Sequence, residues 1–167
     1  MLYRDRSRYR HASRGTDTQV KWIDLPPVWL ALFLSLAWIQ AQHLPVGGMG
    51  GAWADFVGGL CVGGGLLLMV LAFAEMRRQR TTVIPHRIPD QLVDGGIFRR
   101  SRNPIYLGDT LVLVGMILRW EALPSLLLVP LFMWLITDRF IRPEETRLDD
   151  TFGARFAAYK ARTRRWI

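Results

Sequence analysis

Four long apolar runs constrain this chain more than any other feature. They lie at residues 26–44, 53–75, 104–120 and 122–141 of a chain of 167 residues, half of which are apolar. A helix that crosses a bilayer needs about 20 mostly apolar residues, which every run except the third provides. Soluble helices keep a polar face, and residues 66–74 have none. We therefore expect an all-α integral membrane bundle with about four transmembrane helices, and favour it over a soluble helical bundle.

The positive charge is distributed as a membrane topology requires. The net charge is +8, and nearly all of the 22 Lys and Arg residues lie before the first run, between the second and third, or after the fourth. Cytoplasmic loops carry an excess of these residues. We therefore place both termini and the loop 77–102 in the cytoplasm. The basic excess then reflects topology and attraction to anionic lipid, and we expect no nucleic-acid partner.

The chain divides into a short arm and one domain. Residues 1–20 are too polar to bury a face and are expected to form a disordered basic arm, whereas residues 21–167 form a single domain. The only cysteine, Cys61, rules out a disulfide framework and a cysteine-based metal site. His86 has no partners at metal-ligand spacing, so we expect no metal.

Local signals predict how the helices start and pack. Gly59 and Gly63 form a small-xxx-small face that lets another helix approach closely. Asn103 is a good N-cap for a helix that opens at Pro104. From Glu144 onward, apolar residues recur at near-helical spacing between basic residues. That pattern is typical of a helix lying in the membrane interface, with a local break at Gly153.

The tight connection between the third and fourth runs brings polar helix ends together. Asn103 and Tyr106, which begin the third helix, become neighbours of the residues that end the fourth: Arg139, Arg142, Glu144 and Glu145. The backbone of residues 92–96 can fold over them. A cluster of mixed charge under a loop suits an amphiphilic cofactor, and paired carboxylates beside a membrane are costly without a function.

Simpler roles are open for several polar residues. Arginines at helix ends can merely extend to water or form ordinary ion pairs. We prefer that interpretation for Arg99, Arg100, Arg162, Arg164 and Arg165. Asp109 lies inside the third run, where it can form a salt bridge to Arg139, pack as a hydrogen-bonded polar group, or contact a substrate.

The segment LVDGGIFRRSRNPIYLGD, followed by RPEETRLDDTFGARFAAYKARTRRWI, resembles the isoprenylcysteine carboxyl methyltransferase and phospholipid methyltransferase superfamily. The shared pattern is Leu-Val-x-x-Gly-x-(Tyr/Phe), then Arg-(His/Asn)-Pro-x-Tyr-x-Gly, then Glu-Glu. The likeness covers residues 85–167, whereas the first two runs carry no recognisable signature. It implies an integral membrane enzyme that uses S-adenosylmethionine, and Asn at the His/Asn position is common among bacterial relatives, so an inner membrane is expected.

The resemblance also implies roles for individual residues. Leu92 and Val93 would hold the cofactor through backbone groups, and Phe98 would supply an aromatic wall. The other implied cofactor contacts are Gly96, Asn103, Pro104, Tyr106, Glu144 and Glu145. Phe140 stands where the family has a substrate-binding arginine, so Arg139 or Arg142 would replace it, with Glu144 as the acidic catalytic group.

The expected function is therefore S-adenosylmethionine-dependent methyl transfer to a lipophilic small molecule or lipid at the cytoplasmic membrane face. A second interpretation is an NADPH-dependent oxidoreductase, because sterol reductases share the Arg-(His/Asn)-Pro-x-Tyr-Leu-Gly-Asp segment that includes Asp109. A third is a non-catalytic membrane protein. The sequence leaves open the acceptor, whether its nucleophile is O, N or S, and the oligomeric state.

Overall fold

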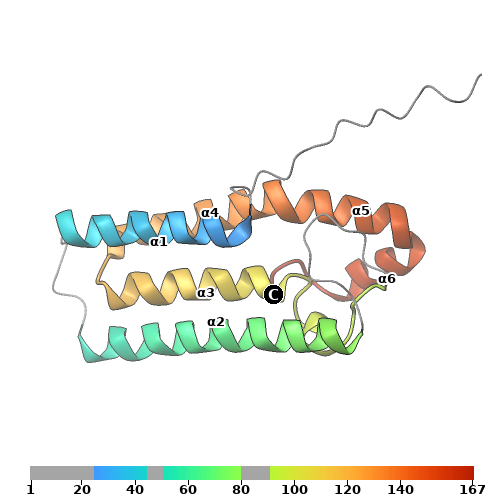
Figure 1. The fold of residues 1–167 in the computed structure, drawn as a ribbon, viewed down its shortest axis with the longest axis horizontal. Coiled ribbons are helices and arrows are strands. Elements are labelled where there is room, and N and C mark those ends of the chain that lie inside the picture. The colour runs from blue at the N-terminus through green and yellow to red at the C-terminus, as the bar shows by residue number, and fades with distance from the viewer. Residues whose placement is uncertain (1–24, 45–50, 80–90) are drawn as a thin grey trace, which may run out of the picture.

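The computed structural model describes residues 25–44, 51–79 and 91–167, and the regular elements among them are all helical (Figure 1). The predicted arm at 1–20 lies outside the described residues, as does His86. The elements are α1 (Pro26–His43), α2 (Ala52–Arg78), the 3-10 turn η1 (Gly96–Arg99), α3 (Pro104–Arg119), the 3-10 turn η2 (Leu123–Leu127), α4 (Leu128–Ile136), the π-helical turn η3 (Thr137–Ile141), α5 (Arg142–Phe152) and α6 (Ala154–Arg162).

Helices α1 to α4 lie side by side and alternate in direction, with α3 between α2 and the other two (Figure 1). At one end of this bundle α1 and α3 begin while α2 and α4 end. Helices α5 and α6 continue past that end, and the C-terminus returns to the start of α3. We call residues 91–103 together with α5, α6 and the tail 163–167 the cap. The four helix ends and the cap together form the site described below.

Two of the helices are long and apolar enough to cross a membrane. They are α2, with mean hydropathy 2.3, and the continuous helical stretch Leu123–Phe152, with mean hydropathy 1.4. The outward face of α2 exposes large apolar side chains, among them Phe56, Leu60, Leu67 and Val70. A surface of that kind belongs against lipid or another protein rather than water. The expected helical architecture is confirmed, and two helices are candidate membrane spans, whereas the crossing of a membrane by about four helices stays a prediction.

Two pairs of glycines set the distance between α2 and α3. Gly58 faces Gly115, and Gly65 faces Gly108. In both pairs, a Cβ added to either glycine would lie 2.6–2.7 Å from the carbonyl oxygen of its partner. The two helices therefore touch through their backbones, an approach that needs residues without side chains.

The predicted packing face at Gly59 and Gly63 is wrong. A Cβ at Gly63 would meet nothing within 4 Å, and one at Gly59 would meet only the end of the Arg119 side chain at 3.9 Å. Seven residues make two helical turns, so Gly58 and Gly65 share a face, whereas Gly59 is rotated by about 100° from it. Because α2 contains several glycines, the sequence alone could not show which of two faces packs against α3. The structure shows that it is the face with Gly58 and Gly65.

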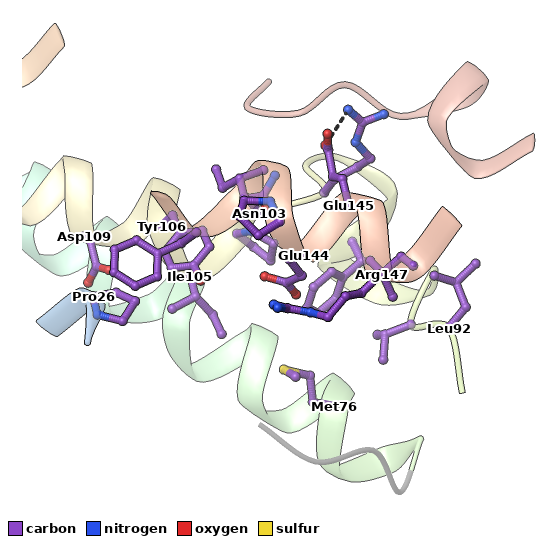
Figure 2. Close-up of a pocket in the computed structure, with 18 of the residues that line it drawn as sticks. Pro26, Met76, Leu92, Asn103, Ile105, Tyr106, Asp109, Glu144, Glu145 and Arg147 are labelled. Carbon is purple, nitrogen blue, oxygen red and sulfur yellow. Dashed lines mark hydrogen bonds and ion pairs between the residues drawn. The ribbon is translucent and has the colours of Figure 1, made fainter. Parts of the chain in front are cut away.

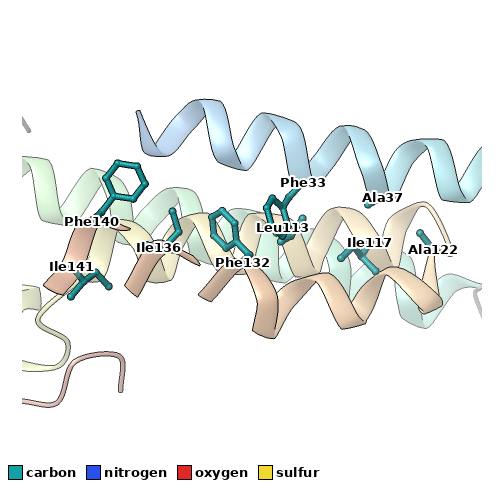
Figure 3. Close-up of a cluster of buried hydrophobic side chains, with 9 residues drawn as sticks. All are labelled: Phe33, Ala37, Leu113, Ile117, Ala122, Phe132, Ile136, Phe140 and Ile141. Atoms are coloured by element: carbon teal, nitrogen blue, oxygen red, sulfur yellow. The ribbon is translucent and has the colours of Figure 1, made fainter. Parts of the chain in front are cut away.

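The main apolar core lies where α1, α3 and α4 meet (Figure 3). Its side chains are Phe33, Ala37, Leu113, Ile117, Ala122, Phe132, Ile136, Phe140 and Ile141. The rings of Phe33 and Phe132 meet edge to face, with 5.2 Å between their centroids. This arrangement satisfies the aromatic quadrupoles and joins the first helix to the fourth.

A second apolar cluster holds the cap on α2. It consists of Ala72, Leu92, Phe98, Phe156 and Tyr159, all buried. We expected the apolar face of the last helix to meet the membrane interface, but Phe156 and Tyr159 pack inward on the protein. The break at Gly153 is confirmed, because its φ of +46° ends α5 and lets α6 turn back onto the cap.

The C-terminal tail is fastened to the segment before α3. The backbone N–H of Arg102 donates to the carbonyl of Arg164 at 3.0 Å. The Asn103 side-chain amide and the Ser101 hydroxyl both donate to the carbonyl of Arg165, at 2.9 and 3.4 Å. Asn103 occupies the N-cap position, but its side chain makes no capping bond to α3 and holds the tail instead.

A carboxylate between two arginines reinforces this attachment. Glu145 accepts hydrogen bonds from Arg102 Nη2 at 2.9 Å and from Arg165 Nη2 at 2.6 Å. The hydrogen bond to Glu145 raises the pKa of Arg165 above its usual value, so this guanidinium stays charged. Glu145 and Arg102 are 15% and 12% exposed, which limits screening by water.

Gly65→Ala is expected to destabilise the protein by about 1–3 kcal/mol, because its methyl group forces α3 away from α2. Gly63→Ala is the matched control, since it adds the same methyl group in open space and should be neutral or stabilising by about 1 kcal/mol. Thermal unfolding in detergent measures both. Equal midpoints for the two variants would contradict the backbone contact.

Glu145→Gln is expected to cost about 2–3 kcal/mol of stability, because it leaves two guanidinium groups without a counter-charge in a largely buried setting. The control is Asp138→Asn, which breaks an ion pair to Arg142 at 2.7 Å between side chains that are 52% and 62% exposed. That change should cost less than about 0.5 kcal/mol. A loss no larger in Glu145→Gln than in Asp138→Asn would show that the cap does not depend on this cluster.

Candidate functional site

A cavity of about 480 Å³ lies between the bundle and the cap. It is bounded by the start of α1, the end of α2, the start of α3, the turn η3, α5 and residues 91–93. Its walls are mostly apolar with a few charged groups, as is usual for small-molecule sites of about 300–1,000 Å³. Figure 2 shows side chains from several of these elements converging on it.

Most of the residues predicted from sequence line this cavity. They are Leu92, Val93, Phe98, Asn103, Pro104, Tyr106, Arg139, Glu144 and Glu145. They come from three separate segments, namely residues 92–98, the start of α3, and η3 with the start of α5. The antiparallel packing of α3 and α4 brings the last two segments together, as the short connection between them predicts.

Two predicted residues do not line the cavity. Arg142 is exposed, and its guanidinium donates to Asp138 at 2.7 Å, one turn earlier on the outer side of the helix. Gly96 sits in a turn with φ of +51°, where the carboxylate of Glu75 occupies the position that a Cβ would need. Gly96 therefore allows the cap to approach α2. The catalytic role predicted for Arg142 and the cofactor contact predicted for Gly96 both stay predictions.

Glu144 and Arg147 form the charged centre of the cavity, which the neutral Tyr106 also lines. Glu144 and Arg147 project from α5 into the same space, opposite Met76 of α2 (Figure 2). The Glu144 carboxylate and the Arg147 side chain lie next to each other there, and Tyr106 lines the same cavity. Glu144 keeps accessible surface because it faces this open cavity, although protein atoms crowd it on other sides. The arrangement offers one negative and one positive group to the same ligand.

Asn103 and Glu145 reach the cavity wall but are largely committed to the cap. The amide nitrogen of Asn103 is bonded to the tail, which leaves its carbonyl oxygen for a ligand. Both oxygens of Glu145 bond to arginines. These contacts indicate that the two residues position the wall of the cavity.

Asp109 lies deeper in the bundle, beside Tyr106 and Pro26 at one end of the cavity (Figure 2). It is only 6% exposed. The salt bridge to Arg139 that the sequence allowed is not formed between these two described residues. Nor does any other described residue hydrogen-bond or ion-pair with the Asp109 carboxylate.

The π-helical turn η3 places Arg139 at the cavity. A π turn inserts an extra residue into a helix and changes which side chains face inward, and such turns recur at functional sites. The Arg139 guanidinium lies 5.6 Å from the ring centroid of Trp29 in α1. Of the two arginines that the sequence offered in place of Phe140, Arg139 is therefore the one at the cavity.

Sequence reasoning missed several wall residues. Arg147 follows Glu144 by three positions, a spacing that puts both on one helical face and was available as a signal. Met69, Phe73 and Met76 of α2 also line the wall, but nothing in an apolar span marks them in advance. Tyr159 lines it as well: burial raises the pKa of its hydroxyl, which stays protonated and donates to the carbonyl of Phe98 at 2.7 Å.

A sequence profile of the phospholipid methyltransferase family matches residues 53–155, more than half of the chain. The match includes α2, although the sequence showed no signature in the first two apolar runs. It ends just inside α6 and so takes in the η1 turn, the start of α3 and the Glu144–Glu145 pair. Searches of curated proteins and of solved structures gave no significant match. The extent of the profile match settles the family: the chain belongs to the phospholipid methyltransferases.

Proposed function

We propose that this protein transfers a methyl group from S-adenosylmethionine to a lipophilic acceptor at the cytoplasmic face of a membrane. The proposal rests chiefly on one observation. In a chain of this family, Tyr106, Glu144 and Arg147 converge in a largely apolar cavity beneath residues 92–98. The two long apolar helices support a membrane location, and the positive-inside distribution of charge favours a cytoplasmic cap.

The charged groups of the cavity fit S-adenosylmethionine. This cofactor carries an ammonium, a carboxylate and a sulfonium group, so a matching site needs charges of both signs. Glu144 and Arg147 provide them side by side, and the rings of Phe98 and Tyr106 offer faces that stabilise a cation. Leu92 and Val93 line the wall with backbone groups nearby for polar contacts. The bound cofactor supplies a methyl group that is already activated.

The chain's own residues would then provide alignment and a medium of low polarity. Methyl transfer from a sulfonium is an in-line displacement, so holding donor and acceptor at the right distance is the main catalytic contribution. The mostly apolar walls keep water from the reacting groups and strengthen electrostatic contacts. Met69 and Phe73 of α2 line the cavity on the side nearest the exposed apolar face of α2, and Phe73 is itself exposed. A lipophilic acceptor can enter there from the side.

Purified protein in detergent is expected to bind S-adenosylhomocysteine and not NADPH in isothermal titration calorimetry. The methyltransferase family match weighs against the reductase alternative, and calorimetry tests this directly. NADPH binding without S-adenosylhomocysteine binding would favour the oxidoreductase. Binding of neither would leave a non-catalytic membrane protein and remove the proposal.

Glu144→Gln is expected to weaken S-adenosylhomocysteine binding by about tenfold, equivalent to about 1.4 kcal/mol, because it removes the negative half of the Glu144–Arg147 pair. Arg142→Gln is the matched control, since Arg142 lies two residues away but outside the cavity. Its affinity should change by less than about twofold. If the two variants lose affinity equally, the charged centre of the site has been misplaced.

A further inference from the structure

Four exposed arginines come from two separate segments of the chain that meet at the cap. Arg77 and Arg78 end α2. Arg99 ends the η1 turn, and Arg100 follows it. None of these four side chains has an ion-pair or hydrogen-bond partner among the described residues. We call them the arginine corner.

The η1 turn is fixed beside the last turns of α2, which it contacts directly. Phe98 of this turn is buried in the apolar cluster that it shares with α2. The carboxylate of Glu75 lies against the backbone at Gly96 and offsets only part of the positive charge. Asp94 cannot offset the remainder, because it is already paired with Arg162. The arginine corner therefore keeps a net positive charge.

The exposed apolar face of α2 leads directly to these arginines. Two helical turns take about seven residues, so Arg77 follows Val70 on one face and Arg78 follows Leu71. Val70 and Leu71 are 62% and 44% exposed, and α2 is one of the two helices long and apolar enough to cross a membrane. A surface that is apolar along its length and cationic at its end matches a lipid with an anionic head group.

We propose that an anionic phospholipid binds at the arginine corner, with its phosphate between the arginines of α2 and those of η1. Guanidinium groups suit this role because they bind phosphate oxygens through two parallel hydrogen bonds. The acyl chains would lie along Val70 and Leu71. The lipid would join η1 to α2 from outside and so fasten the cap over the cavity that Phe98 lines.

This lipid is a bound partner and not an acceptor of the methyl group. The four arginines do not line the cavity, so the inference does not rest on the proposed function. It differs from a general attraction between a basic protein and an anionic membrane, because it depends on where the positive charges lie. Substitutions that remove equal charge from different places therefore test it.

Native mass spectrometry of detergent-purified protein, titrated with dioleoylphosphatidylglycerol in about 0.15 M salt, measures this binding. Arg99→Gln/Arg100→Gln should bind the lipid about 25-fold more weakly than the native protein, since each arginine near an anionic lipid surface contributes about fivefold. Arg77→Gln/Arg78→Gln should lose a similar factor, because both segments hold the same head group. A loss in only one of these variants would overturn the bridge between α2 and η1.

The control is Arg119→Gln/Arg142→Gln, which removes the same charge elsewhere. Arg119 ends α3 at the opposite end of the bundle, and Arg142 begins α5, which continues from α4 on the other side of α3 from α2 (Figure 1). Salt screens such exposed charges, so the affinity should change by less than about twofold. Equal losses in the control and in the other two variants would reveal a diffuse attraction and overturn the site.

Thermal unfolding identifies which parts of the lipid are recognised. Dioleoylphosphatidylglycerol should raise the midpoint of the native protein and of the control, with a smaller rise in either variant of the arginine corner. Dioleoylphosphatidylcholine has the same chains without a net charge, and glycerol phosphate has the anionic group without chains. A rise as large with phosphatidylcholine would overturn recognition of charge, and one as large with glycerol phosphate would overturn the apolar contact along α2.

Discussion

The backbone contact between α2 and α3 determines where the site can form. Gly108, which touches Gly65, lies between Tyr106 and Asp109 on α3. Any side chain at this crossing would widen it and shift both of these cavity-lining residues relative to Met69 and Phe73 on α2. Because helices in lipid gain little from hydrophobic attraction to one another, close packing of this kind is their main source of precise association. The same contact therefore holds α2 and α3 together and fixes the geometry of the cavity.

The cap depends on a second set of interactions of a different kind. Polar bonds from the tail to Ser101, Arg102 and Asn103 close a segment that has little regular structure of its own. The Glu145 carboxylate and the Arg102 guanidinium are little exposed, so water screens their attraction weakly. The ion cluster therefore contributes more to the stability of the cap than an exposed ion pair would. The apolar cluster around Phe156 and Tyr159 then seals the cap against α2. Apolar packing and ion pairing thus both hold the cap in place, and the cap forms one wall of the cavity.

Much of this arrangement was predictable because it follows from local sequence and short connections. Pro104 and Gly153 mark helix boundaries by their own backbone preferences. The tight link between α3 and α4 brings Tyr106 near Glu144. What the sequence could not reveal were choices made between distant segments. Several glycine faces existed in α2, and only contact with α3 selected Gly58 and Gly65. Asn103 was expected to cap the start of α3, yet its side-chain amide donates instead to the carbonyl of Arg165 in the tail, 62 residues away.

The same limitation applies to charge. Sequence alone grouped Glu144 with Glu145 as a functional pair and left three roles open for Asp109, because spacing reveals nothing about neighbouring cations across the fold. In the structure Glu145 bonds to two arginines, Glu144 shares the open cavity with Arg147, and Asp109 is buried at the inner end of that cavity. This gradient runs from the cap into the bundle, from the end accessible to a water-soluble cofactor toward the end lined by apolar side chains. Under the proposed function, the methyl donor would enter from the first of these ends and the lipophilic acceptor from the second.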